Sequence, residues 1–328
     1  MMNITLSIVI CTYNGERIIE RCLQSILKQS YRDYEILCID GVSADNTQAI
    51  IGRYANADQR IKLMINPNRF PEGAGNGKWL GFKAAKGAVL GIIDQDNVIQ
   101  RNDLFALVVK QFGDRRITGI LAGLKHDLKD AAIIRYISLF GTDSFFAYRS
   151  VDRVTRYRQK SMEEYERITL DPANLLLTGG NVFFYRMSDL RSIGGYTSDV
   201  VNVREIVTIS KKTELIIIPD ATKHYAEKNF INLMFKKYLW ARTYFNNRAN
   251  KFNYYPRNPR EYYLFIKNIL FCALVFPNYY YALVLYLKCK DSVVFWFPLI
   301  AFVNMAVYGF NLCKDFTVGK LKEYIVAF

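Results

Sequence analysis

Residues 6–14 read LSIVICTYN, a short run of mostly apolar residues that ends in three polar ones. The same order of apolar run, polar turn and helix-like stretch recurs as far as about residue 123. The expected strands are Leu6–Cys11, Tyr34–Asp40, Ile61–Asn66, Ala88–Asp94 and Ile117–Gly123. The expected helices between them are Glu16–Gln29, Asp45–Tyr54, Gly77–Lys86 and Asn102–Gln111. Strands that alternate with helices of this length pair in parallel through right-handed crossovers, so the sequence predicts an α/β fold.

Polar side chains follow three of these strands where the strands end. In parallel sheets, ligands bind beyond the carboxyl ends of the strands. The candidate binding residues are therefore Thr12, Tyr13 and Asn14 after the first strand, Asp40 after the second, and Asp94 and Asp96 after the fourth.

The middle of the chain is less regular. Residues 124–170 are polar, rich in Arg and Tyr and weakly periodic, which is typical of an insertion or a mobile acceptor segment. Periodicity returns in a strand within Leu175–Arg186, a short helix, a second strand at Glu214–Pro219 and a helix over Asn229–Arg248.

Two C-terminal stretches, residues 268–287 and 292–313, contain no charged residue. Each reaches the roughly 20 residues that cross ~30 Å of hydrocarbon, so the sequence predicts two transmembrane helices. Pro277-Asn278 and Asn304 interrupt these stretches and leave a re-entrant hairpin or an interfacial helix pair open. The expected domains are residues 1–248, which carry the site candidates, and residues 249–328, which carry the membrane segments.

The chain is strongly basic, with 44 Lys and Arg against 30 Asp and Glu, a net charge of +14. Eight of the basic residues lie between Lys236 and Lys267, against the single acid Glu261. Basic residues collect on the cytoplasmic side of membrane proteins, so we expect residues 1–248 on the cytoplasmic face. No DNA- or RNA-binding signature accompanies the charge, so nucleic acid is not an expected partner.

Asp94-Gln95-Asp96 places two carboxylates at a strand end with one residue between them. Mg²⁺ and Mn²⁺ prefer oxygen ligands and usually keep phosphate in their coordination shell. The pattern therefore indicates either a metal that bridges a nucleoside diphosphate or an Asp-rich turn with Asn97.

The order of these motifs resembles the nucleotide-sugar domain of the inverting family 2 glycosyltransferases, over about residues 4–245. The family's opening pattern is present at Ser7–Asn14, and its VDDGSTDGT pattern appears at Ile39–Thr47 with Gly41 in place of the second Asp. The resemblance implies a GT-A fold, a Rossmann-like mixed sheet. It also implies that Asp40, Thr12, Tyr13 and Asn14 bind the nucleoside, with Gly41 leaving uridine and guanosine both open.

The same resemblance assigns further residues to the site. Lys78 and Trp79 stand where the family usually has an Arg-Asn pair, and Lys78 would carry positive charge to the diphosphate. Asp94 would bind both the nucleotide sugar and the metal. The remaining implied positions are Asp96 and His224 for Mn²⁺ or Mg²⁺, and Gly179, Gly180 and Asn181 on the acceptor side.

Inverting transfer to a hydroxyl needs a carboxylate that takes the proton. Counting from Gly194-Gly195, the family's base falls at Glu205, with Asp199 as the second candidate. The expected function is metal-dependent inverting transfer of a sugar from a UDP- or GDP-sugar to a lipid-linked or cell-surface glycan acceptor, in cell-envelope polysaccharide synthesis. A polyprenyl-phosphate acceptor, which needs no base, stays open, as does a catalytically degenerate membrane scaffold.

Overall fold

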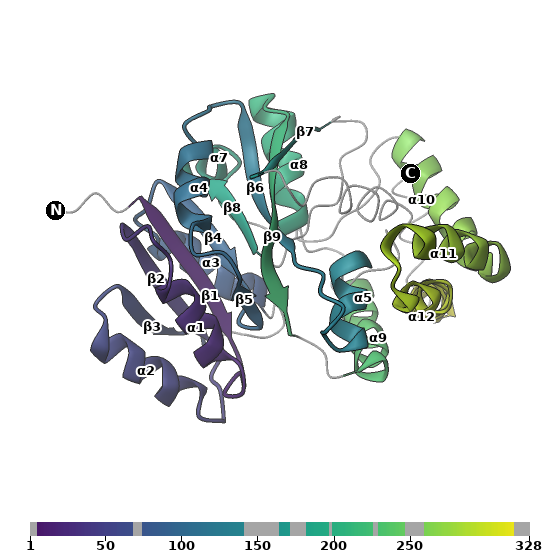
Figure 1. Cartoon of the computed structure of the whole chain (residues 1–328), viewed down its shortest axis with the longest axis horizontal. Coiled ribbons are helices and arrows are strands. Elements are labelled where there is room, and N and C mark those ends of the chain that lie inside the picture. Colours follow the sequence, from purple (N-terminus) through teal and green to yellow (C-terminus); the bar gives the residue numbers. More distant parts are fainter. Residues whose placement is uncertain are drawn as a thin grey trace. The chain divides into compact units, whose positions relative to one another are not determined.

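The computed structural model describes residues 5–67, 74–140, 164–170, 182–196, 199–225, 229–246 and 259–317. The chain forms two compact units, and Figure 1 shows the elements of both. Unit 1 contains residues 1–125 and 160–226, and unit 2 contains residues 126–159 and 227–328. These limits differ from the expected boundary at residue 248, because the helix that precedes this boundary packs with the C-terminal helices.

Unit 1 is built on a nine-stranded sheet (Figure 1). The strands are β1 Leu6–Thr12, β2 Tyr34–Asp40, β3 Ile61–Ile65, β4 Val89–Ile93, β5 Asn97–Ile99, β6 Ile117–Leu124, β7 Glu166–Thr169, β8 Val182–Arg186 and β9 Glu214–His224. Their order is β3-β2-β1-β4-β8-β6-β9-β5, and β7 also pairs with β9. The five strands expected before residue 124 are all confirmed, with ends shifted by one residue at most.

The sheet is mixed, as the GT-A resemblance implies. β3, β2, β1 and β4 pair in parallel, and β8 then runs antiparallel to both β4 and β6. β9 is parallel to β6, whereas β5 and β7 are antiparallel to β9. The carboxyl ends of β1, β2 and β4 therefore lie at one edge of the sheet, where the site candidates are expected.

Helices bury both faces of this sheet. Alternate residues of β1 point to opposite faces, with Ile8 and Ile10 in one apolar cluster and Val9 in another. The first cluster includes residues of α1 (Ile19–Leu27), α2 (Thr47–Ala57) and α4 (Leu104–Gln111). The second is formed with α3 (Ala74–Ala84), α7 (Met187–Ser192) and α8 (Asp199–Ser210).

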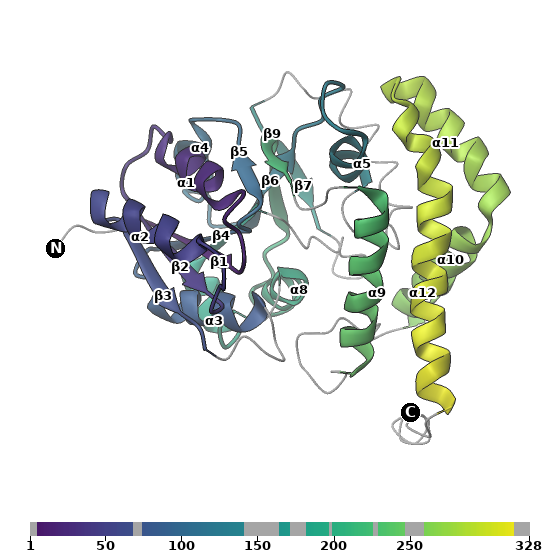
Figure 2. The ribbon, with the colours of Figure 1, turned by 90° about the horizontal axis from the view of Figure 1, so that it is seen from below.

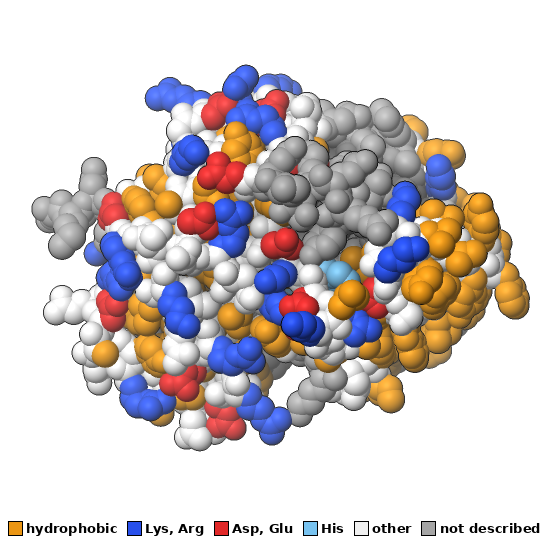
Figure 3. Space-filling model, viewed as in Figure 1, with side chains coloured by type: hydrophobic (Ala, Val, Ile, Leu, Met, Phe, Trp, Pro, Cys, Tyr) orange, Lys and Arg blue, Asp and Glu red, His pale blue; other side chains and the backbone are white. Residues whose placement is uncertain are grey.

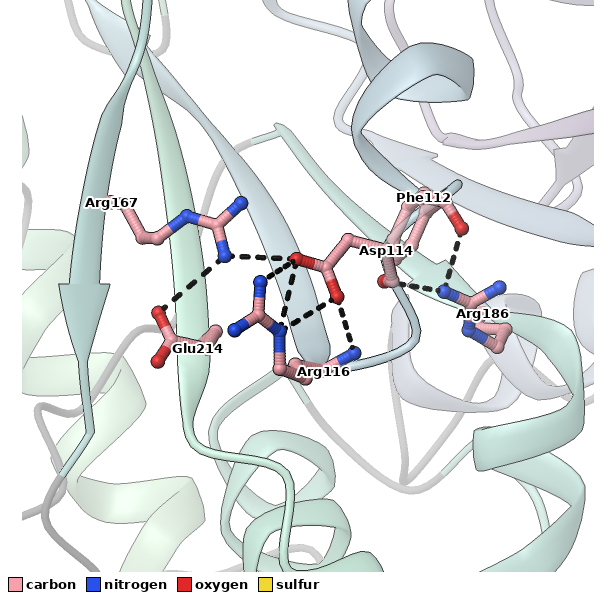
Figure 4. A network of polar contacts seen from close by, with 6 residues as sticks. All are labelled: Phe112, Asp114, Arg116, Arg167, Arg186 and Glu214. Atoms are coloured by element: carbon pink, nitrogen blue, oxygen red, sulfur yellow. Dashed lines mark hydrogen bonds and ion pairs between the residues drawn. The ribbon is translucent and has the colours of Figure 1, made fainter.

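Figure 4 shows an ion network at the opposite edge of the sheet, where β6 and β9 begin. Asp114 precedes β6 and accepts hydrogen bonds from Arg116 at 2.8 Å and from Arg167 of β7 at 3.0 Å. Arg167 also lies 3.9 Å from Glu214 of β9, and Arg186 donates to the carbonyl of Asp114 at 3.1 Å. The hydrogen bonds from Arg116 hold the pKa of Asp114 well below its usual range. These ion pairs and hydrogen bonds thus link β7 and β9 to the turn before β6.

Unit 2 is helical. Its elements are α5 Ala132–Phe140, α9 Phe230–Asn246, α10 Pro259–Ala273, α11 Val275–Cys289, a 3₁₀ helix η2 Ser292–Trp296 and α12 Phe297–Thr317. Helix α12 packs against α9, α10 and α11, and Figure 2 shows α9 beside it. Stacked rings join these helices, with Phe140 4.8 Å from Phe297 and Phe230 4.7 Å from Trp296. Helix α5 lies within the stretch that sequence periodicity left unassigned.

The two continuous helices expected at residues 268–287 and 292–313 are not what the structure shows. The first stretch breaks at Leu274, between α10 and α11, and the second begins as η2 before α12. Pro277 and Pro298 explain the breaks, since each ring clashes with the carbonyl four residues earlier and lacks an N–H. Among the described helices, none combines the length and apolar composition needed to cross a bilayer.

Candidate functional site

Asp40 organises the turn that follows β2. Thr12 lies opposite Asp40 in the parallel register, and its hydroxyl donates to the Asp40 carboxylate at 2.8 Å. The Ser43 N–H, the Ser43 hydroxyl and the Gln48 amide donate to the same carboxylate at 2.8, 2.6 and 2.8 Å. A carboxylate accepts about four hydrogen bonds, and that of Asp40 is fully buried. In this structure its oxygens are therefore used within the turn, and nucleoside binding by Asp40 stays a prediction.

Asn14 joins the turn after β1 to the turn after β2. It adopts a left-handed backbone with φ 46°, which Asn tolerates better than most residues. Its N–H donates to the Ser43 hydroxyl, and its side-chain oxygen accepts from the Ala44 N–H, both at 2.9 Å. The Gly15 N–H donates to the Thr47 hydroxyl at 2.7 Å. The two turns therefore form one hydrogen-bonded platform.

Gln95, the middle residue of the Asp94–Asp96 turn, joins this platform to the paired carboxylates. The Tyr13 N–H donates to Gln95 Oε1 at 3.0 Å, and Gln95 Nε2 donates to the Tyr13 carbonyl at 3.1 Å. A Cβ at Gly15 would overlap the Gln95 side chain, so glycine is required there for this contact. Sequence reasoning missed Gln95, because the middle position of the motif carries no charge.

Helix α3 brings Lys78 to the first carboxylate. Lys78 Nζ lies 3.3 Å from Asp94 Oδ1, and its side chain is 9% exposed. Gly77 and Gly81 permit this approach, since a Cβ at either position would meet Cys11 or Val9 of β1. The neighbouring Trp79 is half-buried and packs on Phe82, with ring centroids 5.6 Å apart. Packing thus explains why Trp79 stands where the family usually has the Asn of an Arg-Asn pair.

β9 brings His224 to the second carboxylate. Asn97 of β5 pairs with His224 of β9, and His224 Nδ1 lies 3.3 Å from Asp96 Oδ1. The Tyr225 N–H donates to the Asp96 carbonyl at 2.8 Å, which fixes the loop. The expected strand ended at Pro219, but β9 continues five residues further, and this continuation is what places His224.

Asp96 and His224 fit a divalent metal as a partial ligand set. His224 Nδ1 is buried and makes no hydrogen bond, although it faces the carboxylate at 3.3 Å. An imidazole nitrogen beside a carboxylate suits Mn²⁺, which accepts both kinds of ligand. Among the described residues, no group of three or more His, Cys, Asp and Glu is arranged around a common point. Two protein ligands with diphosphate oxygens is the usual arrangement where substrate completes the shell.

A cysteine lies behind the carboxylates but is unsuited to chemistry. Cys22 Sγ lies 4.0 Å from the Asp94 carbonyl oxygen and is fully buried. Burial raises the pKa of the Cys22 thiol well above its usual value, and Cys38, Asp96 and Asp94 raise it further. Because the thiolate is the reactive form, Cys22 serves as an apolar packing residue.

The remaining candidates are less closely defined. Glu205 lies on α8, half-buried, and α8 packs on α7 and β6. The side chain of Asp199, at the start of α8, lies outside the described residues, as do Gly179, Gly180 and Asn181. The roles of these five residues stay predictions.

A family model identifies the family to which the chain belongs. The model for glycosyl transferase family 2 matches residues 7–190, which include both turns, Lys78 and the paired carboxylates. The chain belongs to this family. The sequence resemblance to this family is confirmed.

Curated relatives match about a third of the chain. Glycosyltransferase GlyG of Streptococcus pneumoniae is 32% identical over 101 residues, 31% of this chain and 33% of that protein. The Escherichia coli enzyme WfgD, named as a UDP-Glc:α-D-GlcNAc-diphosphoundecaprenol β-1,3-glucosyltransferase, is 34% identical over 98 residues, 30% of this chain and 37% of WfgD. The chain thus spans about a third of the length of these relatives.

Solved structures support the fold over most of the chain. The mannosyltransferase PcManGT of Pyrobaculum calidifontis, solved with GDP-Man and Mn²⁺, superposes with a TM-score of 0.56 at 14% identity, covering 92% of this chain and 86% of that one. At this identity the likeness shows the GT-A-like fold alone.

Proposed function

We propose that this glycosyltransferase moves a sugar, with inversion, from a UDP- or GDP-sugar to a lipid-linked or cell-surface glycan acceptor. The observation that carries the proposal is the convergence of three groups at one sheet edge: the Thr12–Asn14 turn, Lys78 beside Asp94, and His224 beside Asp96. This edge lies beyond the carboxyl ends of β1 and β4, where α/β sheets bind ligands. The reaction for which WfgD is named, a transfer to a diphosphoundecaprenol-linked sugar, supports the acceptor class.

The donor would lie across the hydrogen-bonded platform. Thr12, Tyr13 and Asn14 would meet the nucleoside, and Asp40 would act mainly by holding Thr12 and Ser43 in place, because its own oxygens accept bonds within the turn. Gly41 supplies no carboxylate to contact the nucleobase, so uridine and guanosine nucleotides remain the two donor classes. Lys78, held beside Asp94, would add one positive charge for the diphosphate.

Asp96 and His224, with Asp94, would hold Mn²⁺ or Mg²⁺ against the diphosphate. Such a cation stabilises the negative charge that develops on the departing nucleoside diphosphate. Glu205, or Asp199 on the same helix, would take the proton of an acceptor hydroxyl. A polyprenyl-phosphate acceptor is the second candidate. It needs no base, because a phosphate is already anionic at neutral pH.

The site would work on the cytoplasmic face of the membrane, because eight basic residues lie between Lys236 and Lys267 and the cytoplasmic leaflet carries the anionic lipids that attract such segments. Protease protection tests this placement: the catalytic unit should be digested in lysed cells and protected in intact spheroplasts. Digestion in intact spheroplasts would contradict it.

A donor screen tests the central proposal. The purified full chain is scanned for thermal stabilisation by UDP- and GDP-sugars with and without Mn²⁺, because a ligand that binds the native state raises its melting temperature. One donor class should stabilise the protein, and Asp96→Ala should remove the Mn²⁺-dependent part and abolish transfer. Unchanged activity in Asp96→Ala would reject the metal assignment. A folded chain that binds no donor would favour a degenerate scaffold.

A further inference from the structure

Helices α10 and α11 of unit 2 turn large apolar side chains outward. The exposed residues are Tyr263, Ile266, Leu270 and Leu274 along the first helix and its end, and Phe276, Tyr280, Leu283 and Leu287 along the second. Their spacing of three or four residues places each set on one helix face. Phe276 is 86% exposed and Tyr280 is 74% exposed, far above what apolar packing in water favours.

The opposite face of α11 buries Asn278 and Ala282 together with Leu285. Asn278 of α11 is buried and donates from its amide to the Phe271 carbonyl at 2.6 Å, and Ala282 is buried one turn later. Asn304 of α12 is also fully buried. Polar residues that face the interior of a helix bundle while apolar residues face outward are typical of protein surrounded by lipid. Helix α11 thus exposes large apolar side chains while it buries a polar residue, unlike a helix that faces water.

The charges around this face are positive. Lys267 on α10 and Lys290 after α11 are exposed, and Lys288 is half-buried. Asp291 is the one carboxylate among the side chains described between residues 259 and 307, and it is 2% exposed and paired with Arg135 at 2.8 Å. Figure 3 shows hydrophobic side chains gathered over α10 and α11.

We infer that the outward face of α10 and α11 docks on the surface of an anionic lipid bilayer. Each helix has 15 residues, about 22 Å at 1.5 Å per residue, and would lie along the boundary between headgroups and acyl chains. The exposed tyrosines suit that boundary because each has an apolar ring and a polar tip. The inference deepens the proposed membrane placement by naming the surface that makes the contact.

Charge favours lipid over a second copy of this chain. Two such faces would bring Lys267, Lys288 and Lys290 of each copy together with no exposed carboxylate described on either face. Anionic headgroups would instead attract each basic residue near the surface. A lipid surface also covers the exposed apolar residues of both helices at once.

Flotation of the full chain with vesicles tests the inference. The chain should float with phosphatidylcholine–phosphatidylglycerol vesicles and more weakly with phosphatidylcholine alone. The double variant Phe276→Ser, Leu283→Ser should lower the partition coefficient by about tenfold or more, since apolar burial drives interfacial binding. The matched control is Ile65→Ser at the end of β3, which removes a 49% exposed apolar side chain from unit 1 and should float as the unaltered chain does.

Other outcomes overturn the inference. Equal flotation of the double variant and the unaltered chain would show that this face does not bind the bilayer. The same conclusion would follow if the chain formed a dimer without vesicles and the substitutions dissociated the dimer while flotation was unchanged. The added fluorescence of Phe276→Trp should be quenched most by lipids brominated near the glycerol, and stronger quenching at the bilayer centre would reject the in-plane arrangement. Nucleotide-induced thermal stabilisation of the double variant should be unchanged. If the unaltered chain floats with the vesicles but binds no nucleotide sugar, only the proposed sugar transfer is refuted.

Discussion

Replacing Gln95 with alanine removes both hydrogen bonds between the paired-carboxylate turn and the Tyr13 peptide, at 3.0 and 3.1 Å. Each such bond contributes about 0.5–1.5 kcal/mol net, and the lower half applies because Tyr13 is partly exposed. The two together amount to about 1–2 kcal/mol. If the bridge holds the nucleoside platform in its binding geometry, this loss weakens nucleotide affinity by roughly 5- to 30-fold.

The assay is calorimetric titration of UDP and GDP into the full chain, with and without Mn²⁺. Gln95→Ala should weaken binding in both conditions, because the bridge positions Tyr13 whether or not metal is bound. Gln95→Glu should lose at least as much, since a carboxylate replaces the donor that faces the Tyr13 carbonyl.

Gln100→Ala is the matched control. Gln100 is exposed on the chain after β5, and its side-chain amide donates to the Val98 carbonyl at 3.1 Å. Its loss should leave nucleotide affinity unchanged. The reasoning is refuted if Gln95→Ala binds nucleotide as tightly as the unaltered chain while Asp96→Ala abolishes the Mn²⁺-dependent part.

Two further predictions concern the base and the ion network. Glu205→Gln should lower turnover by about 10²–10⁴-fold with a hydroxyl acceptor and leave donor affinity unchanged. A comparable loss of turnover in Asp199→Asn alone would assign the general base to Asp199. Small losses in both variants would favour a phosphate acceptor. The pKa of Asp114 is lowered, chiefly by hydrogen bonds from Arg116, so its contribution to stability is present above the unfolded pKa of about 4 and is lost as pH falls through the folded value. Asp114→Asn should therefore flatten the fall in melting temperature below about pH 4, and an unchanged slope would contradict this.

Local periodicity was enough to predict much of unit 1. The strand at Tyr34–Asp40 was predicted with the ends that the structure shows, because an apolar run bounded by polar turns depends only on near neighbours. Thr12, Asp40 and Asp94 were identified as candidates for the same reason, since each follows such a run. Unit 2 was less predictable: α5 lies in a weakly periodic stretch, and two prolines interrupt the apolar segments.

The sequence by itself determined the family, the α/β rhythm and the list of polar residues at the strand ends, because these depend on residue type and spacing. Tertiary structure decided how those residues are used. It gave the Asp40 carboxylate hydrogen-bond donors within its own turn and brought Gln95 to the Tyr13 peptide, 82 residues away in the sequence. It also extended β9, which places His224 beside Asp96. It also decided which side of α10 and α11 faces outward. Contacts of this kind depend on the pairing of distant segments, and near-neighbour patterns carry little information about such pairing.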